Sequence, residues 1–354
     1  MSVAEILAPA PDVGGPAQPL LEARGLTKHF FPGGKLPWRK GSVVRAVDDV
    51  SFAIAKGEVL GVVGESGCGK STLARLIIGL IEQDQGEIIF AGELVRQTLS
   101  LRDLRRRVQM VFQDSYASLN PRITIGDSVA FGPKANGLAP GVANAAVRDL
   151  LGKVGLDART FAGRYPHELS GGQRQRVNIA RALALAPRLV ILDEAVSALD
   201  KSVEAQVLNL LADLKEQLGL TYLFISHDLD VVRFISDRVM VMYLGEIVES
   251  GPADALFSET KHPYTQALIA AMPSLDPDKR TMEAPVTGDP PSPIDPPSGC
   301  RFHTRCPHAE PVCSRVAPRL SVISKAHSVA CHMSQAGSGH SRAAKKPIGE
   351  IVHA

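Results

Sequence analysis

A glycine-rich stretch followed by a lysine and a serine carries the clearest chemistry in the sequence. It reads GESGCGKST and matches the pattern G-x-x-x-x-G-K-[ST]. The glycines let the backbone curl so that successive N–H groups point at phosphate oxygens; Lys70 can reach the β- and γ-phosphates, and the Ser71 hydroxyl can bind Mg²⁺. An apolar run before it and a helix after it disfavour a chance glycine-rich turn. The predicted phosphate-binding residues are Gly64, Glu65, Ser66, Gly67, Cys68, Gly69, Lys70, Ser71 and Thr72.

Two carboxylates that follow another apolar run could complete such a site. LVILDE, residues 189–194, is short enough for a buried strand and ends in Asp193 and Glu194. Asp193 can hold the Mg²⁺ shell, and Glu194 is placed to polarise an attacking water. The alternative is a strand ending in two solvated acids, which is common. The upstream phosphate loop and the following SALD, residues 197–200, favour the catalytic interpretation.

Three further side chains stand at the ends of apolar runs. Gln113, in MVFQDS, could meet both Mg²⁺ and the attacking water, and His227, after YLFIS, could contact the γ-phosphate from a neighbouring strand end. Phe30 or Phe31 could stack on an adenine ring. Each of these residues also has an ordinary structural interpretation. Their order relative to the phosphate loop and the two acids is what makes them candidates.

The stretch HELSGGQRQRV, residues 167–177, has the features of a second anion site. Two glycines stand between a serine and a glutamine, and an amphipathic, arginine-bearing segment follows at once. A helix N-terminus of this kind can hold an anion, because its first N–H groups have no partner inside the helix. Since the phosphate loop already supplies one site, the sequence raises the question of which phosphate this second site touches.

Strands that alternate with helices are expected around these motifs, which predicts a mainly parallel α/β sheet. Residues 100–185 are mostly helical in pattern and are interrupted by turns. The other expected elements are strands at 20–30, on both sides of the Lys56-Gly57 turn, at 187–195 and at 221–228, helices at 70–80, 202–218 and 229–236, and a hairpin in RVMVMYLGEIVES.

Composition narrows the class of protein. The 354 residues suffice for one large domain or two modest ones. Lys and Arg number 39 against 37 Asp and Glu, so the charge balance does not indicate a nucleic-acid binder. The apolar runs are too short to span a bilayer, and the first twenty residues lack the basic region of a signal peptide. We expect a soluble, cytosolic chain.

Taken together, the ordered motifs resemble the nucleotide-binding subunits of ATP-binding-cassette (ABC) transporters. They are GESGCGKST, VFQD, LSGGQ, LVILDE, SALD and ISHD, within residues 20–270. The resemblance implies a P-loop ATPase cassette: a RecA-like α/β core with an antiparallel β portion and a helical subdomain at about 115–185. QDSYASLNPR, MYLGEIVESG and HPYTQALIAAMP further resemble the importers of dipeptides, oligopeptides and nickel. SYASLNPR and the basic insertion at 32–45 resemble the second of that branch's two unequal ATPase subunits.

The resemblance also implies an answer for the second anion site. In the family two cassettes pack head to tail, so that the signature sequence of one meets the γ-phosphate held by the other. Ser170, Gly171, Gly172 and Gln173 would therefore serve ATP bound to a partner subunit, and hydrolysis of that ATP would open the dimer.

Other roles follow from the same resemblance. Glu194 would be the general base or water-positioning residue, His227 the switch histidine, and Gln113 the link to the membrane-facing helical region. Asp200 would belong to the dimer-contact loop, and Phe30 aligns with the adenine-stacking aromatic. Every catalytic motif is intact, which argues against a cassette that only holds ATP.

Four cysteines crowd the C-terminal part of the chain. Their spacing is C-x5-C-x6-C-x17-C, at Cys300, Cys306, Cys313 and Cys331. In a reducing compartment this favours a metal site over disulfides, and the paired knuckles of structural zinc sites are missing. Four thiolates can hold a [4Fe–4S] cluster, which the importer branch also implies. Zinc and packed, reduced thiols are the alternatives. We expect this segment to lie far from the phosphate loop, so that a cluster in it would have a structural or redox-sensing role and take no part in hydrolysis.

The expected domain organisation follows these boundaries. A segment with six prolines in fifteen residues, APVTGDPPSPIDPPS, should be an extended linker. The parts are a disordered leader at 1–19, the ABC domain at 20–270, the proline-rich linker at 271–298, the cysteine-containing region at 299–333 and a disordered tail at 334–354.

The predicted function is ATP hydrolysis that drives solute import, with short peptides as the solute. Expected partners are a second ATPase subunit that is a paralogue of this one, two membrane-spanning permeases and an extracytoplasmic solute-binding protein. We expect this chain itself to lie at the cytoplasmic face of the inner membrane. Nickel, opines, glutathione or sugars are alternative cargoes. A soluble cassette ATPase that acts on ribosomes or DNA is a rival class; such proteins tend to carry two cassettes or long coiled-coil insertions, which this sequence lacks.

Overall fold

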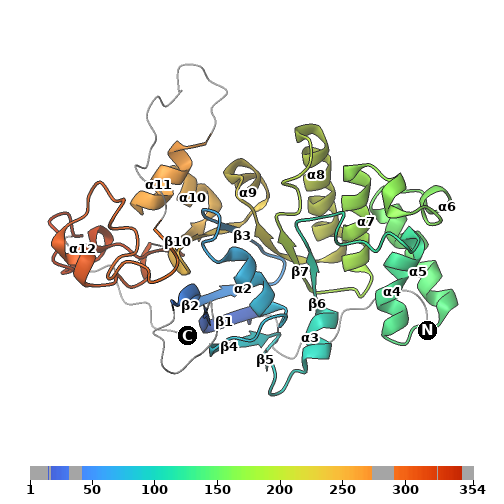
Figure 1. Cartoon of the computed structure of the whole chain (residues 1–354), viewed down its shortest axis with the longest axis horizontal. Helices are drawn as coiled ribbons and strands as arrows, with labels where there is room; N and C mark the ends of the chain where they lie inside the picture. Colours follow the sequence, from blue (N-terminus) through green and yellow to red (C-terminus); the bar gives the residue numbers. More distant parts are fainter. Residues whose placement is uncertain (1–14, 16, 32–41, 273–290, 325, 345–354) are drawn as a thin grey trace.

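The computed structural model describes residues 15, 17–31, 42–272, 291–324 and 326–344. They form a central sheet flanked by a smaller sheet, with a group of helices beyond one edge of the central sheet and the cysteine-containing part beyond the other (Figure 1). Within these ranges, no helix has the length and hydrophobicity that crossing a membrane requires.

The central sheet has eight strands in the order β11-β12-β10-β9-β3-β8-β7-β6. The strands from β9 to β6 pair in parallel, and β9, β10, β12 and β11 pair antiparallel at the other end. Their bounds are β3 Val59–Val63, β6 Val108–Val111, β7 Leu189–Asp193, β8 Thr221–Ile225, β9 Arg238–Tyr243, β10 Glu246–Pro252, β11 Ser321–Ser324 and β12 His327–Val329.

Two hydrophobic cores cover the two faces of this sheet, which explains why its central strands are continuous apolar runs. Every residue of β3, β7 and β8 is buried. Successive residues of β3 alternate between the cores, with Leu60 and Val62 in one and Val59 and Val63 in the other. The helices that follow the parallel strands are α2 Lys70–Ile77, α8 Lys201–Leu218 and α9 Leu229–Ile235.

The smaller sheet is antiparallel, with the order β2-β1-β4-β5. Its strands share one hydrophobic core with α2 and the central sheet. Their bounds are β1 Leu21–Phe30, β2 Val44–Ile54, β4 Gln85–Phe90 and β5 Glu93–Leu94.

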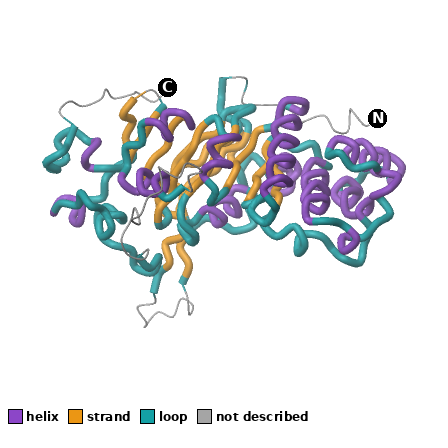
Figure 2. The backbone as a smooth tube through the Cα atoms, turned by 90° about the horizontal axis from the view of Figure 1, so that it is seen from above, coloured by secondary structure: helices purple, strands orange, loops and turns teal. Residues whose placement is uncertain are grey.

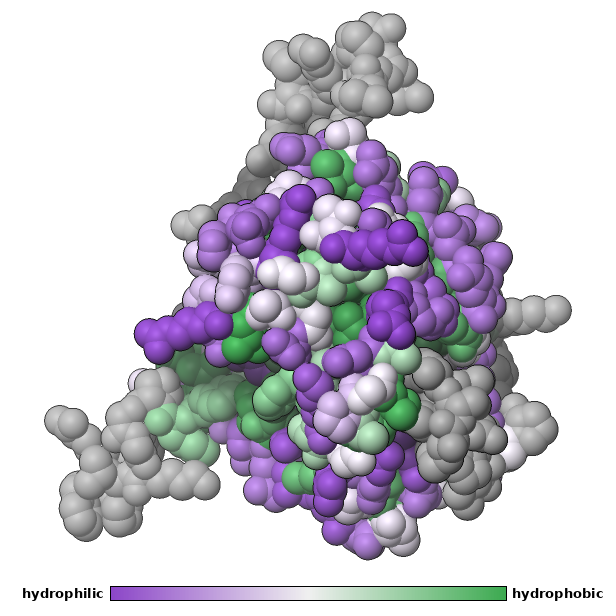
Figure 3. Space-filling model, turned by 90° about the vertical axis from the view of Figure 1, so that its right-hand side faces the viewer, coloured by the Kyte–Doolittle hydropathy of each residue, from purple (hydrophilic) through white to green (hydrophobic). Residues whose placement is uncertain are grey.

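The helical part lies beyond β6, apart from the sheets, as the view from above shows (Figure 2). Its surface is mainly hydrophilic, with hydrophobic side chains in small groups (Figure 3). Several of its helix N-termini carry side-chain caps; Thr124, for example, accepts from the N–H of Asp127. The elements are α4 Ile125–Ala135, α5 Pro140–Lys153, α6 Ala158–Phe161, η1 Pro166–Glu168 and α7 Gly171–Leu183; α3 Leu101–Arg107 precedes β6.

The C-terminal part packs against the antiparallel end of the central sheet. Its strands β11 and β12 extend that sheet beyond β10, and Val329 and Phe302 are fully buried. Its remaining elements are α12 Pro311–Arg315 and η3 His332–Ser334, and α10 Ala253–Ser258 and α11 Pro263–Ala270 precede it in the chain.

The predicted fold class is confirmed: a mainly parallel α/β core, an antiparallel β portion and a helical part are all present. The β4–β5 hairpin and the strands β11 and β12 were not predicted from the sequence. The described structure extends to residue 344, beyond the boundary that we expected at 333, and His340 in this stretch is buried. The leader except residues 15 and 17–19, most of the insertion, the linker from 273 to 290 and the last ten residues lie outside the described residues.

Candidate functional site

The phosphate loop connects β3 to α2, and two of its glycines are required by close backbone contacts. Gly64 has φ 148° and Gly69 has φ 112°, both in the region that favours glycine. A Cβ atom on Gly64 would lie 2.2 Å from the Met242 carbonyl oxygen, and one on Gly69 would lie 2.1 Å from that of Ala46. Any side chain at either position would therefore force the loop away from its neighbours.

Lys70 lies in the loop with its side chain buried. Its Nζ donates to the carbonyl oxygens of Gly64, at 2.6 Å, and Glu65, at 3.0 Å. The Cys68 thiol lies 3.7 Å from the same nitrogen, and burial raises the pKa of this thiol. Its charge is therefore held at the loop by two backbone carbonyl oxygens.

Asp193 and Ser71 bring two oxygen donors together at the end of β7. The Ser71 hydroxyl donates to Asp193 Oδ1 over 3.1 Å. Burial raises the pKa of the Asp193 carboxyl, and the bond from Ser71 partly offsets that effect. A buried carboxylate beside a hydroxyl is a donor set that suits Mg²⁺, which prefers oxygen ligands and relieves the cost of burying the charge. These residues fit the magnesium role that their sequence context predicts.

Glu194 is contacted by both other predicted catalytic residues. Gln113 Nε2 donates to Glu194 Oε2 over 2.6 Å, and His227 Nδ1 lies 3.5 Å from the same oxygen. Glu194 has φ 49°, an unusual value for a non-glycine residue. Its N–H donates to the carbonyl oxygen of Ile225, which ties this residue to the end of β8. The fold therefore brings Gln113, Glu194 and His227 together from three separate parts of the chain.

A single cavity of about 460 Å³ joins these groups to the phosphate loop. Phe30 lies at its edge with 38% of its surface exposed, so its ring is available for stacking; Phe31 does not line it. The lining residues are Phe30, Val44, Ala46, Ser66, Gly67, Gly69, Lys70, Ser71, Thr72, Gln113, Glu194 and His227.

The second anion site lies elsewhere, at the start of α7. Ser170 Oγ accepts from the N–H of Gln173, and Gln173 Oε1 accepts from the N–H of Ser170, which forms a capping box. Ser170 and Gly171 are exposed, and none of residues 170–173 lines the cavity of the phosphate loop. Asp200, the N-cap residue of α8, is also exposed and makes no side-chain cap bond. These residues therefore lie outside the cavity that contains this chain's own phosphate loop.

Comparisons with known proteins agree with this geometry. Residues 47–197 match the ABC transporter family, and residues 248–313 match the C-terminal region of oligopeptide/dipeptide transporters. The probable peptide ABC transporter ATP-binding protein y4tS of Sinorhizobium fredii is 53% identical over 89% of this chain and 90% of its own length. This chain belongs to the ATP-binding proteins of the ABC transporter family.

Further relatives and a solved structure support the same assignment. The oligopeptide transport ATP-binding protein AppF of Bacillus subtilis is 48% identical over 89% of this chain and 97% of its own. OppF of Haemophilus influenzae, of the same description, is 49% identical over 82% and 90%. The structure of cbiO1 from Clostridium perfringens, part of the ABC transporter complex cbiONQ, matches with a TM-score of 0.59 at 28% identity, over 68% of this chain and 91% of its own. The chain is an ABC ATPase, and the predicted resemblance is confirmed.

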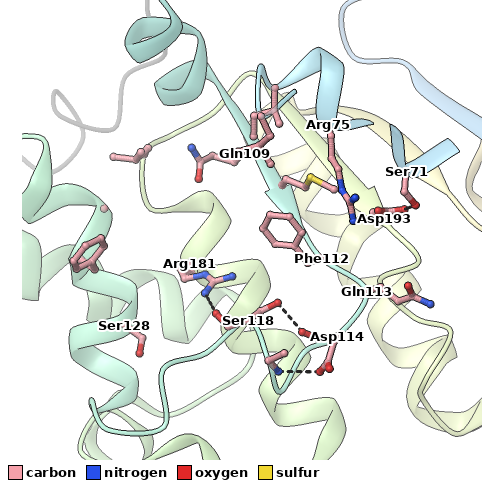
Figure 4. Close-up of a pocket in the computed structure, with 17 residues that line it drawn as sticks. Ser71, Arg75, Gln109, Phe112, Gln113, Asp114, Ser118, Ser128, Arg181 and Asp193 are labelled. Carbon is pink, nitrogen blue, oxygen red and sulfur yellow. Dashed lines mark hydrogen bonds between the residues drawn. The ribbon is translucent and has the colours of Figure 1, made fainter. Parts of the chain in front are cut away.

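A groove of about 710 Å³ adjoins the ATP site of this ABC ATPase, between its core and its helical part. Ser71 and Gln113 line both the groove and the ATP-site cavity. The close-up shows Phe112 between the core strands and the helices, and Arg181 bonded to the Ser118 backbone (Figure 4). The rings of Phe112 and Phe131 are exposed, Phe131 to 67%. Gln113 thus lines an open, partly aromatic groove and is hydrogen-bonded to the Glu194 carboxylate.

The four C-terminal cysteines surround one small enclosed cavity, together with His332 and other histidines. All four are free, and burial raises the pKa of Cys300 to about 12 and that of Cys331 to about 11. His332 Nε2 donates to the Val316 carbonyl, and its buried Nδ1 has no hydrogen-bond partner. Across the described residues, however, no three Cys, His, Asp or Glu side chains are arranged as ligands of one metal ion.

The expectation that this cysteine-containing region lies far from the phosphate loop is wrong. Arg305, next to Cys306 in sequence, forms ion pairs with Glu65 of the loop at 2.9–3.1 Å. Separation along the chain misled the prediction, because the return of the chain through β10 and β12 brings the region back to the loop. Arg305 was not singled out from the sequence; its position between two cysteines was the only available signal.

Proposed function

We propose that this ABC ATPase energises the uptake of dipeptides and oligopeptides across the cytoplasmic membrane, from its cytoplasmic face. The match of residues 248–313 to the C-terminal region of oligopeptide/dipeptide transporters carries this proposal. The names of AppF, OppF and y4tS, each of which refers to peptide or oligopeptide transport, support it.

The cargo is tested by uptake in a strain that lacks this gene. We expect the strain to lose uptake of labelled di- and oligopeptides and to regain it when the gene is supplied on a plasmid. Uptake of nickel, glutathione and sugars should stay unchanged. Undiminished peptide uptake together with lost uptake of one of those solutes would refute the peptide assignment and leave the ATPase in place.

Hydrolysis would use the residues that the ATP-site cavity brings together. The loop N–H groups and Lys70 would bind the β- and γ-phosphates, and Phe30 would stack on the adenine. Bound Mg²⁺, held by Ser71, Asp193 and Gln113, would neutralise phosphate charge. Glu194 would accept a proton from the attacking water, as its bond from Gln113 and its contact with His227 orient it.

The signature residues would act on a second ATPase subunit. Ser170, Gly171, Gly172 and Gln173 stand at an exposed helix N-terminus outside their own ATP-site cavity. Such a terminus suits the γ-phosphate of ATP on a partner cassette, with Asp200 in the adjoining contact loop. ATP would then join the two cassettes, and its hydrolysis would release them. The partner would be a paralogue, because the branch resembled here uses two unequal ATPases.

The groove beside Gln113 would receive a short cytoplasmic helix of a permease subunit. Exposed aromatic rings in a groove next to the Glu194 carboxylate suit the apolar face of a helix. A shift of that helix would move Gln113, which is hydrogen-bonded to Glu194. Phe131→Ser should therefore weaken co-purification with the permeases. Phe234→Ser, an equally exposed phenylalanine on α9 at 64%, is the matched control and should not. Equal retention of the permeases by both variants would refute this docking site.

The four cysteines would hold a [4Fe–4S] cluster, with zinc or reduced thiols as the alternatives. Their shared cavity and the unpartnered Nδ1 of His332 support a bound group, whereas the thiols would have to move to bind one. We expect anaerobically purified protein to contain iron and sulfide and to absorb visible light. Zinc in place of iron, or no metal with four titratable thiols, would exclude the cluster.

The ABC domain would span residues 20–270, and its helical subdomain about 115–185. The helices α4 to α7 fall within that subdomain. The extracytoplasmic solute-binding protein and the two permeases would contact the cargo, so the residues of this chain do not select it.

A further inference from the structure

The loop that carries the first two C-terminal cysteines inserts two arginines into the ATPase core. Arg301, whose side chain is 5% exposed, pairs with Asp48 and with Glu246 and donates to the Leu244 carbonyl. Arg305, whose side chain is 8% exposed, pairs with Glu65 through both of its terminal nitrogens. Arg301 therefore anchors the loop to β2 and to the β9–β10 turn, whereas Arg305 reaches the phosphate loop itself.

Glu65, the second residue of the phosphate loop, is fixed at three of its groups. Its carboxylate accepts from Arg305, its N–H donates to Tyr264 Oη over 2.8 Å, and its carbonyl accepts from Lys70 Nζ over 3.0 Å. Two of these three partners come from the part of the chain that follows β10. The conformation of the phosphate loop at Glu65 therefore depends on residues that no nucleotide-binding motif contains.

The pair also has an electrostatic consequence for the ATP site. ATP brings about four negative charges to the loop, and a bare carboxylate at Glu65 would oppose their approach. Three hydrogen bonds from Nη1 and Nη2 of the Arg305 guanidinium to the two carboxylate oxygens neutralise that charge and hold the carboxylate in one direction. The effect of losing the arginine should therefore grow with the charge of the nucleotide.

Packing ties Arg305 to the cysteine-containing region. Its N–H donates to the Phe302 carbonyl over 3.0 Å, and the Phe302 ring contacts Tyr243 and Tyr264 at 5.4 Å between ring centroids. Cys300 is joined to Cys313 by a backbone bond of 2.7 Å. A change in the arrangement of this loop would thus move Arg305 and the charge that it offers to Glu65.

We propose that Arg305 is a positioning residue of the ATP site: it neutralises and orients Glu65, and so makes the cysteine-bearing loop a structural part of the phosphate-binding site. This inference needs only that the chain binds ATP, and it holds whatever solute is transported.

The test is the affinity of the full chain for fluorescent ATP and ADP analogues, measured with magnesium. Arg305→Gln should raise the dissociation constant for ATP about tenfold, equivalent to about 1.4 kcal/mol, and that for ADP by less. In the double variant Arg305→Gln with Glu65→Gln, the unpaired charge is gone, so the ATP affinity should return to within about threefold of the wild type. Arg305→Lys should lie between, because lysine keeps the charge and loses the forked geometry.

The exposed Arg315 of α12 supplies the matched control, and Arg315→Gln should bind both nucleotides like the wild type. Thermal unfolding of every variant separates a folding defect from a binding defect. If Arg305→Gln binds ATP like Arg315→Gln, or if the double variant binds no better than Arg305→Gln alone, Arg305 does not position Glu65. An equal loss for ATP and ADP in a destabilised variant would assign it a purely structural role.

Discussion

Glu249 on β10 is the residue whose replacement should reveal most about how the C-terminal part is attached. It is fully buried, and its carboxylate accepts from the N–H of Lys261 at 2.8 Å, from the N–H of His262 at 3.0 Å and from His327 Nε2 at 2.8 Å. These donors come from the turn before α11 and from β12. One carboxylate thus joins the strand β10 to two segments on its C-terminal side.

The cost of Glu249→Gln follows from this donor set. The amide of glutamine keeps one acceptor oxygen and turns an NH₂ group toward at least one of the three donors. A lost bond to a charged acceptor costs about 1.5–3 kcal/mol, and a buried donor without a partner costs about 1–3 kcal/mol more. We therefore expect the free energy of unfolding to fall by about 3–5 kcal/mol, in line with broken buried ion pairs.

Scanning calorimetry of the full chain measures this change. A loss of this size should lower the midpoint of the transition that includes the C-terminal part by about 6 °C or more. Glu259→Gln is the matched control, because the Glu259 side chain is 72% exposed and its ion pair with Lys261 should contribute little. Equal midpoints for the two variants would refute the reasoning.

The pH dependence of the Glu249 contribution has a defined sign. Burial raises the pKa of this carboxyl, but the bonds from His327 and the backbone outweigh burial, so its pKa lies below the ordinary value. The unfolded chain therefore binds the proton first as the pH falls. The contribution is complete above the ordinary glutamate pKa of about 4.3 and is lost as the pH falls through the lower folded value. The difference between wild type and Glu249→Gln should accordingly shrink below about pH 4.

Three further predictions concern the ATP site and acid stability. Glu194→Gln should leave ATP binding near the wild-type level and slow hydrolysis by about 10²–10⁴-fold, as expected for loss of a general base; turnover near the wild-type rate would refute that role. Ser170→Arg should weaken ATP binding at the site of the partner subunit and leave nucleotide binding by this chain's own phosphate loop intact. Nucleotide titration of the isolated chain measures the latter. A loss of binding at this chain's own loop would contradict action across the interface. Burial lowers the pKa of His262 to about 4, so the unfolded chain binds the proton first as the pH falls. The free energy of unfolding should therefore fall by up to about 1.4 kcal/mol per pH unit between about pH 6.5 and pH 4. Denaturant unfolding should show this slope in the wild type and not in His262→Gln.

The core of the fold and the ATP site could be predicted because local patterns determine them. The phosphate loop needs glycines at special backbone angles, and continuous apolar runs such as residues 189–193 mark strands buried on both faces. Since the parallel strands β7 and β8 end at one edge of the sheet, the residues that follow them had to lie near each other, and His227 Nδ1 lies 3.5 Å from Glu194 Oε2. The motif order made Gln113 a candidate for the same site as Glu194, and the structure shows a hydrogen bond between the two side chains.

Long-range packing within the C-terminal part could not be predicted from the sequence. The strands β11 and β12 are short; β12 pairs with the edge of β10, and β11 pairs in turn with β12. Likewise, the pairing of Arg305 with Glu65 depends on a return of the chain that no periodicity encodes. The site for ATP on a partner subunit also remains a prediction, because its second half belongs to another chain.

The most direct test of the central claim is peptide uptake in a strain that lacks this gene and receives either the wild type or Glu194→Gln, at equal protein levels. The claim is that ATP hydrolysis at this chain's own site drives the import of peptides. We predict that the wild type restores uptake of labelled di- and oligopeptides and that Glu194→Gln does not. Full restoration by Glu194→Gln would contradict the claim, because transport would then proceed without the carboxylate that the site provides for hydrolysis.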